Sequence, residues 1–215
     1  MACPPQARMK KSNTKCHNLK ILAVSDFIDK SLTKMVEEKT IQPVDLIISC
    51  GDLAPEYLSF LKNKLEKPLF YVKGNHDIRY NNPSTLLGCE NIHAKLVRFK
   101  TLNILGLEGS IWYSGGVNQY TDGQMDKIIF RMWFSLWKKG GVNLVVTHAP
   151  PKNIQDGPDH CHTGFGSFVK LIAKRKPDYF IHGHIHKEFK NFEERTTIVN
   201  STKVINTCGF TILEI

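Results

Sequence analysis

Short apolar runs recur along the chain, and polar side chains directly follow each run. Residues 46–50, 69–73 and 179–182 are the clearest runs, and residues 21–25 and 143–147 repeat the pattern. Apolar runs of about four to eight residues that end in turn-forming residues are typical of buried strands. The pattern therefore predicts core strands whose carboxyl ends bear polar groups.

In chain order, the first three runs are 21–25, 46–50 and 69–73. The two segments between them have the apolar spacing of helices. They are residues 30–39, which Asp29 is placed to cap, and residues 56–65. Strands that alternate with helices along a chain become parallel neighbours joined by right-handed crossovers. The first half of the chain therefore predicts an α/β fold.

The second half is more irregular. A polar connection between residues 94–99 and 102–106 predicts a hairpin, and long loops are expected at 108–124 and 149–166. Helices are expected at 125–138 and 168–176, and strands at 197–199, 203–206 and 210–215. We expect the aromatic stripe of the first of these helices to pack in the core; it comprises Phe130, Trp133, Phe134 and Trp137.

Composition fits an ordinary globular protein of 215 residues, with 41% hydrophobic and 23% charged residues. We expect one domain over residues 20–215, because there is no internal repeat and no second boundary. Residues 1–19 predict a flexible basic leader without the apolar core of a secretion signal. No run is long enough to span a membrane, so we expect a cytoplasmic protein without a membrane partner.

The net charge of +9 is concentrated at the start of the chain. Residues 1–20 hold five of the 29 basic residues and no acid, which leaves 24 basic against 20 acidic residues elsewhere. Such a mild excess suits a phosphate substrate as well as a polyanion. Nucleic acid is therefore an alternative partner that charge alone does not favour.

The cysteines predict neither a disulfide framework nor a structural zinc site. No two of the six have the CxxC spacing. Reduced thiols in the cytoplasm explain them most simply. The six are Cys3, Cys16, Cys50, Cys89, Cys161 and Cys208.

Metal-capable side chains follow all five core strands. Because functional groups of α/β folds gather at the carboxyl ends of strands, we expect these side chains to meet. Mixed carboxylate, amide and imidazole donors suit divalent metals that do hydrolytic work. Two such ions need an anionic bridge, which a carboxylate can supply. The donors are Asp26, Asp52, Asn75, His148, His184 and His186.

The ordered motifs resemble those of the calcineurin-like metallophosphoesterase superfamily, over residues 20 to about 190. The motifs are Ser25-Asp26, Cys50-Gly51-Asp52, Gly74-Asn75-His76-Asp77, Thr147-His148 and Gly183-His184-Ile185-His186. The resemblance implies a four-layer α/β/β/α sandwich, with two central mixed β-sheets flanked by helices and metals at the strand ends. It also implies a metal-dependent phosphoesterase that attacks a phosphomonoester or phosphodiester with a hydroxide bridging two metals.

The resemblance also implies individual roles. Asp52 resembles the carboxylate that bridges both ions. One ion would be completed by Asn75, His148 and His184, and the other by Asp26 and His186. His76 resembles the acid that protonates the leaving oxygen, and Asp77 the residue that orients its imidazole.

One position departs from the family pattern. The first motif usually has the form Asp-x-His, whereas this chain has Asp26-Phe27-Ile28. Isoleucine cannot coordinate a metal, so we expect weaker or more selective binding there. Two divalent ions remain the expected cofactors, with Mn²⁺ first and Fe, Zn²⁺ or Ni²⁺ as alternatives.

Three further histidines have less specific readings. His182 precedes the Gly183 turn, and we expect it to pack or to form local hydrogen bonds. His160 and His162 lie in the 149–166 loop, where substrate contact or surface exposure fits better than a third metal. Of the two, His162 is the better substrate candidate, together with Asn75.

Two other functions remain open at this stage. Ile28 is a first step towards a metal-poor protein-interaction scaffold of the same fold, although the other donors are retained. The basic leader is the one feature that suggests a nuclease. The sequence specifies neither the substrate nor the oligomeric state.

Overall fold

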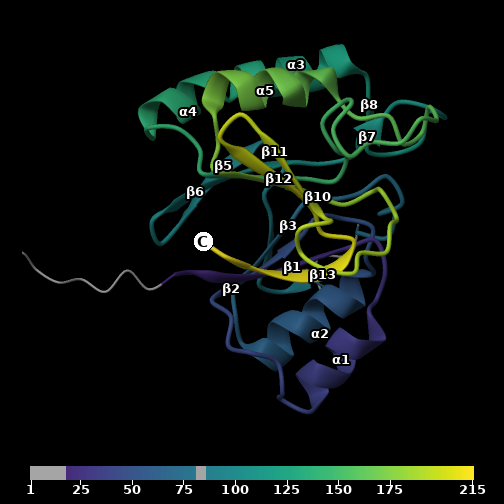
Figure 1. Ribbon diagram of the computed structural model, residues 1–215, viewed down its shortest axis with the longest axis vertical. Coiled ribbons are helices and arrows are strands. Elements are labelled where there is room, and N and C mark those ends of the chain that lie inside the picture. Colours follow the sequence, from purple (N-terminus) through teal and green to yellow (C-terminus); the bar gives the residue numbers. More distant parts are fainter. Residues whose placement is uncertain (1–17, 81–85) are drawn as a thin grey trace, which may run out of the picture.

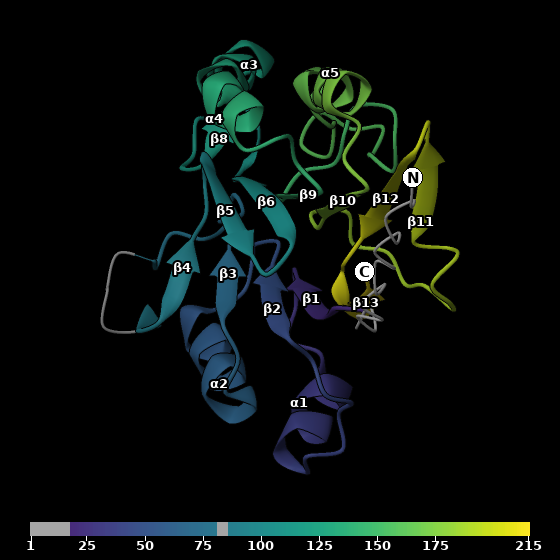
Figure 2. The ribbon, with the colours of Figure 1, turned by 90° about the vertical axis from the view of Figure 1, so that its left-hand side faces the viewer.

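The computed structural model describes residues 18–80 and 86–215. Two sheets lie face to face between two layers of helices (Figures 1 and 2). The expected four-layer α/β/β/α sandwich is confirmed. Most of the predicted leader, residues 1–17, lies outside the described residues. Within the described part, Leu19 is already buried, and its backbone pairs with Ile215.

The first sheet has five strands in the order β13-β1-β2-β3-β4. Three of its neighbouring pairs are parallel, and the β1–β13 pair is antiparallel, so the sheet is mixed. The strands are β1 (Lys20–Ser25), β2 (Leu46–Ser49), β3 (Leu69–Tyr71), β4 (Cys89–Asn91) and β13 (Gly209–Glu214). The helices α1 (Lys30–Glu37) and α2 (Pro55–Leu65) cover its outer face (Figure 1).

The second sheet has six strands in the order β11-β12-β10-β9-β6-β5. They are β5 (Lys95–Phe99), β6 (Leu102–Leu107), β9 (Leu144–Thr147), β10 (Tyr179–His182), β11 (Thr196–Val199) and β12 (Thr202–Asn206). Its outer face is covered by α3 (Asp122–Arg131), α4 (Trp133–Lys138) and α5 (Gly166–Arg175). The short strands β7 (Ser110–Ile111) and β8 (Gln119–Tyr120) pair within the predicted 108–124 loop.

Alternation along the buried strands explains the layers. In β1, Ile21 and Ala23 face the core between the sheets, whereas Leu22 and Val24 pack with residues of α1 and α2. A third core lies between the six-stranded sheet and α3–α5. Strands buried on both faces have continuous apolar sequences, which is the pattern that predicted them.

Asp29 caps α1 as expected, since its carboxylate accepts the backbone N–H groups of Ser31 and Leu32. The single helix expected over 125–138 is instead broken at Met132, between α3 and α4. No helix among the described residues combines the length and apolarity needed to cross a membrane.

The expectation that the aromatic stripe of this region packs in the core is wrong. Phe130, Trp133, Phe134 and Trp137 are exposed to 76%, 49%, 65% and 70%. A second apolar face takes their place, because Met125 and Leu136 are buried, with Ile128, Ile129 and Met132 packed against the same core. Both faces have helical spacing, so the pattern alone could not distinguish the inner from the outer one.

The third core can be tested at Phe168. Its ring is fully buried and lies between Phe165 and Phe180, with centroid distances of 4.8 and 5.6 Å. Phe168→Ala leaves a cavity there, and we expect it to lower the free energy of unfolding by about 3–5 kcal/mol in urea denaturation. Phe134→Ala, at an exposed aromatic position, should change it by about 0.5 kcal/mol or less. Equal losses would contradict the assignment of inner and outer faces.

Candidate metal centre

The candidate site lies where strand ends of the two sheets meet. Asp26 follows β1, and His148 follows β9. Asp52 and His184 stand in the turns after β2 and β10. Asp26, Asp52 and His184 have positive φ angles of 70°, 56° and 68°. Such left-handed backbone is uncommon outside glycine and occurs often at functional sites.

Two glycines let the turns after β2 and β3 approach each other. Gly51 has a φ of +95°, and a Cβ there would come within 2.9 Å of the Gly74 Cα. A Cβ on Gly74 would clash with the Asp52 carboxylate. The glycines are therefore needed so that Asp52 can lie against the next turn.

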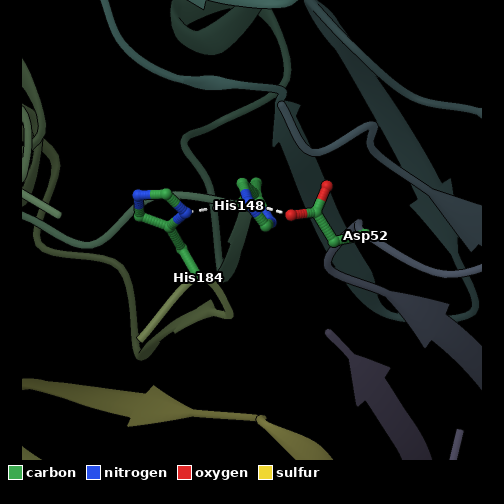
Figure 3. A group of neighbouring side chains, drawn as sticks. All are labelled: Asp52, His148 and His184. Carbon is green, nitrogen blue, oxygen red and sulfur yellow. Dashed lines mark hydrogen bonds and ion pairs between the residues drawn. The ribbon is translucent and has the colours of Figure 1, made fainter. Parts of the chain in front are cut away.

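Three metal-capable atoms converge around a fourth, His148 Nε2. His148 Nε2 lies 3.3 Å from Asp52 Oδ2 and 3.1 Å from His184 Nδ1 (Figure 3). It also lies 3.0 Å from Asn75 Oδ1. Ligands of one ion with bonds of about 2.0–2.2 Å are about 3–3.5 Å apart. His148, His184 and Asn75 are buried, and the Asp52 side chain is 7% exposed. The structure therefore brings together the four residues expected to surround one metal ion.

The outer ring nitrogens fix which atoms face inward. His148 Nδ1 lies 2.8 Å from the Cys50 carbonyl oxygen, and His184 Nε2 lies 2.7 Å from that of Cys161. Since a carbonyl only accepts hydrogen bonds, each of these nitrogens donates its N–H. In the neutral rings, His148 Nε2 and His184 Nδ1 then face each other with lone pairs. Only a proton or a metal ion between them relieves that repulsion, so the donor set fits a metal.

The electrostatics of the pair agree with this geometry. Burial disfavours charge on His148, but the Asp52 carboxylate outweighs it and raises the pKa of His148 to about 9. Burial and the positive His148 together lower the pKa of His184 to about 3. For Asp52, burial is likewise outweighed by His148, which lowers the carboxyl pKa to about 2. The Asp52 carboxylate therefore favours one positive charge at this position, which a bound cation could supply.

Asn75 is oriented by a residue outside the motifs. Its Nδ2 donates to the Tyr113 hydroxyl over 3.1 Å, which turns Oδ1 towards His148. Tyr113 belongs to the 108–124 loop. The carbonyls of Cys50 and Cys161 are further contributors that side-chain motifs cannot reveal.

The second donor pair is more open. His186 Nε2 lies 3.7 Å from Asp26 Oδ1, and the His186 side chain is 65% exposed. Asp26 is held by the Ser25 hydroxyl at 2.7 Å and by the His184 backbone N–H at 2.8 Å. The Cys208 thiol is another neighbour; burial, and then the charge of Asp26, raises its pKa to about 12. The structure thus places Asp26 and His186 together, with Ile28 nearly half exposed.

Asp77 and His76 have different surroundings. Asp77 is buried, and its Oδ2 accepts the backbone N–H groups of Asp52 and Gly74 at 2.8 and 2.7 Å. Burial raises the pKa of Asp77 to about 7. Asp77 therefore ties the two turns together, a role that the motif did not suggest. His76 is exposed and donates its backbone N–H to Asp52 Oδ1, so its expected role as an acid stays a prediction.

Two other histidines lie near the centre. The His162 ring packs against that of His184, with centroids 5.2 Å apart, and its Nδ1 lies 2.9 Å from the Asp159 carboxylate. This position is adjacent to the metal donors, as substrate contact would require. His182 is fully buried, and its Nε2 bonds Gln155 over 2.8 Å, in line with the expected packing role.

An open cleft adjoins the second donor pair. Its volume is about 790 Å³, and its wall includes His186. Aromatic and basic side chains contribute much of the remaining lining. They are Phe27, Lys187, Phe189, Arg195 and Phe210.

Comparisons with known proteins agree with this geometry. The family model described as calcineurin-like phosphoesterase matches residues 19–188. No curated protein sequence matches the chain.

Solved structures share the fold at low sequence identity. The protein TT1561 of Thermus thermophilus has a TM-score of 0.63 and 14% identity, over 92% of this chain and 94% of that one. GAP50, described as the anchor in the inner membrane complex of Plasmodium, has a TM-score of 0.53 and 13% identity, over 88% and 71%. The calcineurin-like phosphoesterase YfkN from Bacillus subtilis has a TM-score of 0.50 and 16% identity, over 91% and 84%.

The approach of the two turns can be tested at Gly74. Gly74→Ala places a methyl group against the Asp52 carboxylate and should weaken Mn²⁺ binding by about tenfold or more in titration calorimetry. Gly123→Ala is the matched control, because a Cβ at that position meets nothing within 4 Å. Unchanged Mn²⁺ affinity in a folded Gly74→Ala protein would contradict the assigned geometry.

Proposed function

The chain belongs to the calcineurin-like phosphoesterase family, and from that premise we propose that it is a metal-dependent hydrolase of phosphomonoesters or phosphodiesters. The convergence of donor atoms of Asp52, Asn75 and His184 within 3.0–3.3 Å of His148 Nε2 supports this proposal most directly. A structural site would be closed, whereas Asp52 also lines an open pocket of about 170 Å³ together with His76.

Two divalent ions are the proposed cofactors. Asp52, Asn75, His148 and His184 would hold one, and Asp26 and His186, with Asp52 as the shared carboxylate, would hold the other. When bound, such ions lower the pKa of water and neutralise charge that develops on the phosphoryl oxygens. We propose Mn²⁺ first, because the second site has a single imidazole and oxygen-rich sites favour that ion over Zn²⁺. Fe, Zn²⁺ and Ni²⁺ are the ions to compare.

The surrounding residues have distinct proposed roles. His76 protonates the leaving oxygen, and its exposed ring is free to meet a substrate. Asp77 keeps the His76 turn in register with the Asp52 turn through the two backbone N–H groups that it accepts. Asn75 and His162 contact the phosphoryl group or its neighbouring substituent. The cleft lined by Phe27 and Arg195 would take the rest of the substrate.

Metal-dependent turnover tests the proposal. With Mn²⁺ added, the protein should hydrolyse bis-p-nitrophenyl phosphate or p-nitrophenyl phosphate, followed by absorbance. Asp52→Asn removes the shared negative charge and should lower kcat/KM by about 100-fold or more. His160→Ala is the control on the neighbouring loop. Absence of metal-dependent turnover on a broad panel of phosphoesters would refute the enzyme assignment.

The leaving-group acid can be isolated by substrate choice. Protonation matters for a poor leaving group and little for p-nitrophenolate, which departs without it. His76→Ala should therefore lower kcat by about 100-fold on an alkyl phosphoester and far less on the p-nitrophenyl ester. Equal losses on both substrates would assign His76 to binding instead.

A metal-poor protein-interaction scaffold is the second candidate. The second donor pair favours this candidate. Ile28 replaces the usual imidazole there, which leaves His186 as the single imidazole beside Asp26. Elemental analysis of the purified protein separates the two functions: a scaffold would hold little metal and a stable protein partner. A nuclease is the third candidate, suggested by the basic leader at residues 1–19; salt-sensitive DNA binding that disappears when these residues are deleted would favour it. For the compartment we propose the cytoplasm, in accord with four free cysteines among the described residues.

A further inference from the structure

The outer surface of α3 and α4 exposes an unusual amount of aromatic area. We call Phe130, Trp133, Phe134 and Trp137 the aromatic stripe; their exposures range from 49% to 76%. Phe130 lies on α3, and the other three lie on α4, which begins directly after Met132. Phe134 and Trp137 lie side by side, with ring centroids 6.1 Å apart. Contiguous exposed aromatic patches of this kind mark interaction sites.

The stripe is not needed for the core. Met125 and Leu136 already bury the opposite face of the same helices against the six-stranded sheet. The helices are therefore apolar on two sides. Burial of the inner side stabilises the fold. The large rings on the outer side stay in water and gain no such free energy from folding.

Basic residues surround the stripe. Residues 122–139 and 166–176, which contain α3, α4 and α5, hold eight Lys and Arg residues and two acidic residues, Asp122 and Asp126. Seven of the eight are exposed, and the Arg175 guanidinium lies 3.5 Å from the centroid of the Trp133 ring. The eight are Lys127, Arg131, Lys138, Lys139, Lys170, Lys174, Arg175 and Lys176.

A shallow groove of about 270 Å³ lies between α5 and the neighbouring α3 and α4. Ile129, Phe130, Trp133 and Leu171 give it an apolar lining, and Lys174 and Arg175 give it charge. Asp126 also lines the groove, and its carboxylate lies 3.8 Å from Lys170 Nζ. Apolar side chains can enter the boundary between the headgroups and the acyl chains of a bilayer, and basic side chains can pair with anionic headgroups. A surface with both is therefore complementary to an anionic bilayer.

We propose that the aromatic stripe and its basic surround dock the protein on the surface of an anionic phospholipid bilayer. The aromatic rings enter the headgroup boundary, and the lysines and arginines meet the lipid phosphates. A bilayer suits this surface better than a nucleic acid does, because the rings project from helices rather than line a backbone-tracking groove. The inference goes beyond the proposed hydrolase activity and does not depend on it.

This inference departs from the expectation of no membrane partner. That expectation rested on the lack of a spanning segment, and surface docking needs none. The docking face also lies away from the strand ends that bear the metal donors: α3 and α4 cover the outer face of the six-stranded sheet (Figure 1). A bound protein would therefore keep its metal centre open to substrate.

Vesicle flotation with the full chain tests the proposal. We expect binding to phosphatidylcholine vesicles that contain phosphatidylserine, weak binding without it, and loss of binding at high salt. The double variant Phe134→Ser with Trp137→Ser should lower the partition coefficient by about tenfold or more. Ile198→Ser is the matched control, because Ile198 is 61% exposed on β11, outside the stripe. Lys138→Glu with Lys170→Glu tests charge, with Lys64→Glu on α2 as its control.

Several outcomes would overturn the proposal. Undiminished binding by the aromatic double variant would place the attraction elsewhere, such as in the basic residues 1–17. No binding of the wild type to anionic vesicles would also overturn it. If sedimentation velocity shows a dimer that the double variant loses, and vesicles do not bind, the stripe is instead an interface between two copies. Unchanged thermal unfolding of the variants confirms that they remain folded.

Discussion

The site depends on two histidine nitrogens that are held face to face. His148 Nε2 and His184 Nδ1 are 3.1 Å apart, and the other nitrogen of each ring donates its N–H to a backbone carbonyl. Neither ring can turn away without losing that buried hydrogen bond. The rigid arrangement makes a cation the natural occupant, with Asp52 and Asn75 completing its surroundings.

Bringing these groups together constrains both sheets. The donors arise in turns after strands of different sheets, so the packing of one sheet on the other sets the distances between them. Close contact of the Gly51 and Gly74 turns, and left-handed backbone at Asp26, Asp52 and His184, are local costs of this convergence. The continuous core between the sheets, built from residues such as Ile48 and Val146, supplies the compensating stability.

Much of the fold could be predicted from sequence, because strands buried on both faces leave continuous apolar runs and the motifs follow them in order. The residues expected around one metal ion do meet. Groups that act through the main chain, such as the Cys161 carbonyl, could not be foreseen, since any residue type supplies them. The role of Asp77 in orienting His76 stays a prediction, and its bonds to two backbone N–H groups could not be predicted from the motif. The aromatic stripe was misplaced because both faces of its helix are apolar, and only packing decides which one lies inward.

The antiparallel pairing of β1 with β13 has a consequence for biosynthesis. In the five-stranded sheet, β1 lies between β2 and the edge strand β13. The residues of β13, Gly209–Glu214, are synthesised almost two hundred residues after those of β1. On the ribosome, β1 can therefore pair with β2 long before its other side is covered. Until the last strand emerges, the nascent chain presents an open, apolar sheet edge, which is where a chaperone would bind and where mispairing between neighbouring nascent chains would begin.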